Sequence, residues 1–206
     1  DTETTSIDPM EAKLVGIGLG IEPGSAWYIP TNGNLGLTKV LAAIKPLLEQ
    51  ETIAFYGHNI KYDIHVLKNH GITIERIGFD TLLASYLLAP QKGRHSLDEL
   101  SLEKFGIVKT PIKDLIGQGK TQKSMLDVPI ETVGKYCCED VDYTCRLKNL
   151  LEKEIGKHHL EAILYEIEIP LISVLVSMER YGMYVDKKQL RTMSTEFAHR
   201  IKKIEL

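Results

Sequence analysis

The sequence has few cysteines, and it lacks both a long apolar run and a strong excess of either charge. No apolar run approaches the roughly 18 residues that a membrane span needs, and its start lacks the basic and apolar stretches of a signal peptide. The cysteines are Cys137, Cys138 and Cys145, an odd and clustered set that fits neither a disulfide framework nor a zinc site. We therefore expect no membrane association and reduced thiols in a cytosolic compartment.

The charge balance does not indicate a particular partner. The net charge is −3, from 25 Lys and Arg against 28 Asp and Glu, so the chain lacks the basic excess of a broad nucleic-acid surface. An enzyme that holds only the end of a strand needs few phosphate contacts, however, so a local basic patch would suffice. The 206 residues, of which 43% are hydrophobic, suit one globular domain of roughly 150 residues and an additional segment.

The expected elements indicate a mixed sheet flanked by helices. Residues 14–21 alternate between apolar residues and glycines, a strand pattern whose glycine face lets a helix approach closely. We expect further strands at the start of the chain, at 26–29 and at 52–56, and helices at 37–49, 59–71, 80–88, 97–105, 129–155, 158–181 and from 186 onward. Asp80 is the expected cap of the helix at 80–88. A meander followed by alternating helices and strands is typical of the ribonuclease-H-like α/β architecture, here with a C-terminal helical extension.

Three short patterns combine acidic residues with regular spacing. They are Asp1 with Glu3 on the first strand, Asn59 with Asp63 at the start of a helix, and Tyr136 with Asp140 within the long helix. Residues two apart on a strand, or four apart on a helix, face the same side. All three patterns in this order are expected by chance about once in sixty such sequences. Together they predict a functional site at one edge of the sheet.

Each of these residues also has an ordinary structural explanation when it is taken singly. Asp1 could be a frayed terminal residue, Asn59 a helix N-cap and Tyr136 a half-buried core residue. Asp63 and Asp140 could be solvated helix positions. Their conjunction favours the functional interpretation.

The carboxylates of Asp1, Glu3, Asp63 and Asp140 would repel one another at close range unless cations were present. Oxygen ligands favour Mg²⁺ or Mn²⁺, and two such ions would balance the charge of the acidic set. Paired ions activate water and stabilise the attacking and leaving oxygens at phosphorus, so the predicted reaction is phosphodiester hydrolysis. Tyr136 fits a hydrogen-bonding group that positions water better than it fits a base, because the pKa of an ordinary tyrosine is near 10.

The segments Asp1–Thr4, Gly57–Asp63 and Tyr136–Asp140 resemble the three exonuclease motifs of the DEDD superfamily, tyrosine subtype. The similarity is greatest to the 3′–5′ editing domains of bacterial family A DNA polymerases. The segment Glu166–Asp186 looks like the beginning of the polymerase domain that leads to the thumb. The resemblance implies an exonuclease domain at residues 1–155 and a truncated start of a polymerase domain at residues 156–206.

The resemblance also implies a role for each acidic residue. Asp1 would contact both divalent ions, and Glu3 and Asp140 would hold the ion that carries the attacking water. Asp63 would hold the second ion, and Tyr136 would orient the water.

Four further residues would contact DNA according to the same resemblance. Asn59 and Tyr62 would contact the last nucleotides of the single strand. Arg94 would lie near the substrate phosphates, with a solvated arginine as the alternative. Ile7 would contact the terminal bases, with simple core packing as the alternative.

The implied function is a metal-dependent proofreading exonuclease, part of a DNA-directed DNA polymerase in replication and repair. Its partners would be the single-stranded 3′ end of DNA and the polymerase domain of the same full-length chain. We expect a monomer in the bacterial cytoplasm, associated with the nucleoid. The alternatives are an RNA 3′ exonuclease similar to ribonuclease D, and a catalytically inert DNA-binding domain that supports the polymerase.

Overall fold

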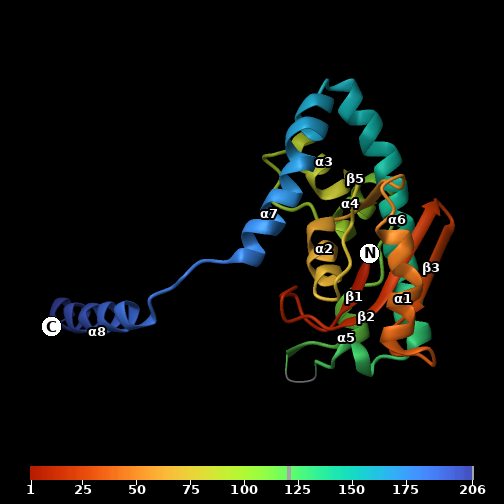
Figure 1. The fold of residues 1–206 in the computed structure, drawn as a ribbon. Helices are drawn as coiled ribbons and strands as arrows, with labels where there is room; N and C mark the ends of the chain where they lie inside the picture. The colour runs from red at the N-terminus through yellow and green to blue at the C-terminus, as the bar shows by residue number, and fades with distance from the viewer. Residues whose placement is uncertain (120–121, 206) are drawn as a thin grey trace. The chain divides into compact units, whose positions relative to one another are not determined.

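The computed structural model describes residues 1–119 and 122–205 and contains two small sheets (Figure 1). The first is antiparallel and consists of β1 (Thr2–Thr4), β2 (Leu14–Glu22) and β3 (Ser25–Pro30) in this order. The second pairs β4 (Phe55–Gly57) with β5 (Ile77–Asp80) in parallel. Antiparallel and parallel pairing thus occur together, as expected for this fold class, although the hydrogen bonds form two separate ladders.

Helices account for most of the remaining chain, and only some of them were expected. They are α1 (Gly36–Leu48), α2 (Ile60–Lys68), α3 (Thr81–Leu88), α4 (Leu97–Phe105), α5 (Ile112–Ile116), the short η2 (Met125–Asp127), α6 (Ile130–Lys157), η3 (Ile163–Glu168), α7 (Ile169–Tyr181) and α8 (Lys187–Ile204). Strand β5 and helix α5 were not expected from the sequence. In the described parts of the chain, no helix has the length and apolar character of a membrane span.

Helix α6 packs on the antiparallel sheet because β2 presents glycines to it (Figure 1). A Cβ atom on Gly18 would lie 2.5 Å from Cys137 Sγ and 2.7 Å from Val141 Cγ2, both on α6. A Cβ atom on Gly20 would meet Val141 Cγ1 at 2.5 Å. The expectation that the glycine face admits a helix is confirmed. The close approach places the first half of α6 beside β1, where Cys137 contacts Asp1.

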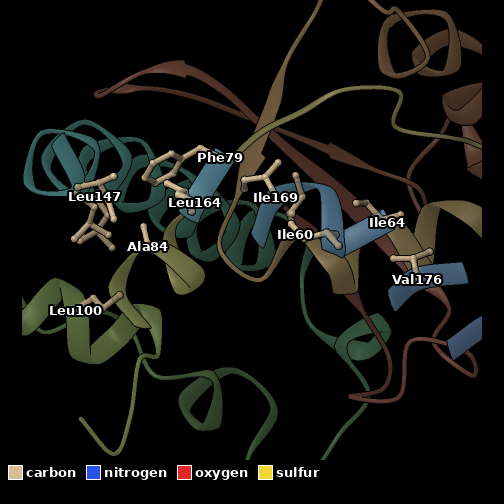
Figure 2. Close-up of a cluster of buried hydrophobic side chains, with 12 residues drawn as sticks. Ile60, Ile64, Phe79, Ala84, Leu100, Leu147, Leu164, Ile169 and Val176 are labelled. Carbon is tan, nitrogen blue, oxygen red and sulfur yellow. The ribbon is translucent and has the colours of Figure 1, made fainter. Parts of the chain in front are cut away.

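The main hydrophobic core joins elements that lie far apart in the sequence. Figure 2 shows buried side chains from α2, β5, α6 and α7 in one cluster, among them Ile60, Phe79 and Leu147. Leu164 and Val176 belong to the same cluster. The first compact unit accordingly runs from Asp1 to Val176, and Ser177–Leu206 form a second unit. The predicted domain division after residue 155 stays a prediction.

The helix expected over residues 158–181 differs from the structure at its beginning. His159 has a positive φ of 57°, which separates α6 from the next helix, and helical residues resume at position 161. The six residues of η3 then form a π-helical segment directly before α7. Pro170 explains this segment: proline lacks the amide N–H, and its ring clashes with the carbonyl four residues earlier in a regular α-helix. The wider π turn relieves that conflict.

Candidate active site

Two acids lie beside α6: Asp1 directly before β1 and Glu3 on this strand. Glu3 is only 6% exposed, and its Oε1 atom has no hydrogen-bond partner. Carboxylate oxygens of Asp1 and Glu3 and the Cys137 Sγ atom all lie within 4.8 Å of one another. A buried acceptor without a partner is costly, so the free oxygen of Glu3 suits a site that receives a cation. Among the described residues, this is the cluster that could hold a metal ion through acidic, histidine or cysteine side chains.

Asp63 reaches the same strand from α2. Its carboxylate accepts a 2.7 Å hydrogen bond from Thr2 Oγ1, and Asp63 is buried. The start of α2 is held by Asp80, whose carboxylate accepts the Ile60 N–H at 2.8 Å while it also caps α3. The capping role expected for Asp80 is therefore confirmed, and it serves two helices at once.

Asp140 on α6 pairs with a lysine that the sequence did not single out. The side chain of Lys109 is fully buried, and its Nζ atom forms ion pairs with Asp140 and, at 3.3 Å, with Asp98. The same Nζ atom lies 5.3 Å from the centre of the Tyr136 ring. Lys109 stands in a segment without helical or strand periodicity, so no sequence signal distinguished it from the other lysines. Only the folded chain brings it to two of the predicted site residues.

The ionisable groups of the site influence one another. Burial, together with the charges of Asp140 and Asp63, raises the pKa of Glu3 to about 7. Burial and the charges of Asp140 and Glu3 also raise the pKa of Tyr136 well above its ordinary value, so its hydroxyl keeps its proton. Burial alone would lower the pKa of Lys109, but Asp140 and Asp98 raise it, and the lysine stays charged. Asp63 and Asp140 thus lie in the electrostatic neighbourhood of Glu3, although neither belongs to the close group around Cys137.

Asn59 and Tyr62 precede Asp63 at the start of α2. Asn59 has a left-handed backbone with φ of 61°, and its side chain makes no capping hydrogen bond. Asn59 therefore stands at the N-cap position of α2, as the structural alternative expected, but its side chain does not cap the helix. The Tyr62 hydroxyl donates to the Ser6 carbonyl at 2.5 Å and contacts the Thr4 hydroxyl, which ties α2 to the segment after β1.

Ile7 and Arg94 lie on the surface. Ile7 is 97% exposed, so the alternative that it packs in the core is wrong. The Arg94 side chain is 82% exposed and lies 3.7 Å from the Glu99 carboxylate. Neither residue contacts the acidic cluster through an interaction that the structure records, and their roles in DNA binding stay predictions.

The α/β fold, with acidic residues at its first strand and on the late helix α6, belongs to the ribonuclease-H-like fold class. The family described as 3′–5′ exonuclease matches residues 1–156. The chain is 40% identical over 212 residues to DNA polymerase I of a Synechocystis species and 36% identical over 215 residues to that of Pseudomonas aeruginosa. Both alignments cover 100% of this chain and only 21% and 24%, respectively, of those relatives. The chain therefore belongs to the 3′–5′ exonuclease family of DNA polymerase I.

Solved structures agree with this fold. The structure titled POL domain of Pol1 from M. smegmatis, in complex with DNA primer-template and dNTP, aligns with a TM-score of 0.78 at 20% identity. The alignment covers 98% of this chain and 31% of that one. Brucella melitensis NrnC with bound Mg²⁺ aligns with a TM-score of 0.60 at 21% identity, over 86% of this chain and 80% of that one. At these identities the likeness shows the fold alone.

Proposed function

We propose that this chain is the proofreading module of a bacterial DNA polymerase I, which removes nucleotides from the 3′ end of DNA. The observation that carries the proposal is the buried Glu3 carboxylate, which has one oxygen without a hydrogen-bond partner, lies beside Asp1 and is affected by the charges of Asp63 and Asp140. Such a concentration of negative charge needs cations to be stable. The family membership supplies the reaction class, hydrolysis from the 3′ end.

The residues present suit divalent ions. Asp1, Glu3, Asp63 and Asp140 would hold two Mg²⁺ or Mn²⁺ ions, because hard ions prefer carboxylate oxygens. The solved NrnC with bound Mg²⁺ supports this choice of metal only as a protein of the same fold. When bound, the ions supply activation of water and neutralisation of charge on the phosphate.

The chain's own residues would position the reactants. Tyr136 keeps its proton and therefore acts as a hydrogen-bond donor that orients water, not as the base. Asn59, exposed at the start of α2 with its side chain outside the helix cap, would contact the terminal nucleotide. Tyr62 would present its ring beside Asn59, since its hydroxyl is engaged by the segment after β1. The exposed Ile7 and Arg94 would meet a base and a phosphate, respectively.

The substrate and partners follow from the relatives. We expect a frayed primer terminus as substrate and the polymerase domain of the full-length chain as the partner that delivers it. Function as a monomer in the bacterial cytoplasm, close to the nucleoid, belongs to the same proposal.

The direct test uses the full-length enzyme with Mg²⁺ and 3′-labelled single-stranded DNA. Asp140→Ala should lower the rate of mononucleotide release at least about 100-fold, because it removes several kcal/mol of transition-state stabilisation. Asp114→Ala is the matched control, since Asp114 is exposed on α5.

Absence of nucleotide release from the wild type, or release that survives Asp140→Ala, would overturn the proposal. A parallel assay with RNA of the same sequence separates the RNA exonuclease from the proofreading enzyme. Faster release from RNA than from DNA would favour the RNA exonuclease instead.

A further inference from the structure

Lys109 places a positive charge where the proposed function needs metal ions. Its side chain has no exposed surface, whereas its partner Asp98 is 57% exposed and Asp140 is 14% exposed. A charged amine that water cannot reach is stabilised by its carboxylate partners, and Asp140 is the more buried of these two partners. Asp140 thus already has a cationic partner within the chain, the Lys109 amine.

If position 109 served only the stability of the fold, an apolar residue would suit it better than a lysine. Removing a charged amine from water is expensive, and replacing a buried ion pair with apolar residues is often neutral or stabilising. Buried charges beside a functional site are therefore candidates for a role in that site. The Nζ atom contacts Asp140 and lies over the Tyr136 ring, so one cation can orient both side chains.

We propose that Lys109 is a positioning residue that holds Asp140 and Tyr136 in place and competes with a divalent ion for the Asp140 carboxylate. The inference rests on the proposed function of the same site. Without an ion, the lysine satisfies Asp140 and limits repulsion from Glu3. A bound ion would share the Asp140 carboxylate with the lysine, so the amine would still orient Asp140 while its charge opposes the ion, and Asp98 keeps the amine paired.

Two opposite effects follow from this arrangement. Removing the lysine removes a competitor and one positive charge, so the ion should bind more tightly. The same change frees Asp140 and Tyr136 to adopt other rotamers, so the chemical step should become slower. A residue that merely maintained the fold would weaken metal binding and turnover together.

The experiment compares full-length wild type with Lys109→Met, Lys109→Arg and the control Lys113→Met, since Lys113 is exposed on α5. Calorimetry with Mn²⁺ measures the dissociation constant at the exonuclease site, taken as the binding that Asp140→Ala removes. Single-turnover assays on DNA measure the rate of cleavage.

Lys109→Met should lower the Mn²⁺ dissociation constant about 10-fold and slow cleavage at least about 10-fold. Lys109→Arg keeps the charge and should restore the wild-type affinity, and Lys113→Met should match the wild type in both measurements. Weaker or unchanged Mn²⁺ binding in Lys109→Met would overturn the inference. If the wild type bound no Mn²⁺ at Asp140, the proposed function itself would fail.

Should Lys109→Met not fold, Asp98→Asn provides the second test, because Asp98 is exposed on the first turn of α4. Without its second partner the lysine should hold Asp140 more firmly. The Mn²⁺ dissociation constant should then rise about 3-fold, and an unchanged or lower value would overturn the inference.

Discussion

Burial is the largest cause of the shifted pKa values of Glu3, Tyr136 and His58, which lie in or near the site. It raises the pKa of Glu3 and of Tyr136, and the neighbouring carboxylates add to this effect. Burial shifts the pKa of His58 in the opposite direction. Burial and the charge of Lys109 lower this pKa to about 4, and the charge of Asp98 raises it by a smaller amount. The neutral imidazole is held by a 2.9 Å hydrogen bond between Nδ1 and Thr81 Oγ1.

The neutral state of His58 predicts a loss of stability in acid. In the unfolded chain a histidine has a pKa near 6.5, so the unfolded state binds a proton that the folded state does not bind until about pH 4. The free energy of unfolding should therefore fall as the pH drops from about 6.5 to about 4, by at most about 3 kcal/mol from this residue. Urea unfolding across this range should show a shallower pH dependence for His58→Gln than for the wild type.

The exposed His158 provides the control for this experiment, and His158→Gln should keep the wild-type slope. The other groups that act on His58, Asp98 and His95, remain in both variants. Equal slopes for His58→Gln and the wild type would show that His58 titrates normally in the folded protein.

The sequence predicted correctly those secondary-structure features that depend on interactions between residues close in the chain. The glycine alternation of β2 and the cap at Asp80 were both anticipated, because a strand pattern and an N-cap need only nearby residues. The π-helical segment η3 was not anticipated, because Pro170 admits several responses and packing selects one of them. Strand β5 was missed because Ile77–Asp80 is too short to show a period.

The contact between β2 and α6 predicts a specific packing defect. Gly18→Ala would place a Cβ atom 2.5 Å from Cys137 Sγ, so α6 must shift away from the sheet. We expect a loss of about 1–3 kcal/mol in the free energy of unfolding, measured in urea. The shift would also displace Tyr136 and Asp140, so nucleotide release should slow. Gly93→Ala is the control, because its Cβ atom would meet no atom within 4 Å, and equal stability of the two variants would contradict the prediction.

On the scale of the whole molecule, the hydrophobic core extends past the segment that the family match covers. The match ends at residue 156, whereas Leu164, Ile169 and Val176 are buried in the same cluster as Phe79 and the residues of α6 (Figure 2). The first compact unit therefore needs the chain as far as Val176.

Two truncated chains test this dependence. A chain of residues 1–155 lacks the apolar side chains that η3 and α7 contribute, each of which stabilises a core by about 1.5–3 kcal/mol when fully buried. Thermal unfolding should show a markedly lower midpoint, or no folded state, for residues 1–155 than for residues 1–181. Equal midpoints would mean that residues 1–155 fold independently, with the predicted domain division as the end of the folding unit.

The amino-acid sequence by itself determined the class of fold, most of the helices and the acidic set, because periodicity, caps and spaced motifs are properties of neighbouring residues. It also determined the family, since the three motifs keep their order and their elements. Only the tertiary structure decided which groups are in contact and which are buried. It leaves one Glu3 oxygen buried without a hydrogen-bond partner, bonds Thr2 to Asp63 and pairs Lys109 with Asp140. Burial and contact between distant segments depend on how the whole chain packs, and no local pattern records them.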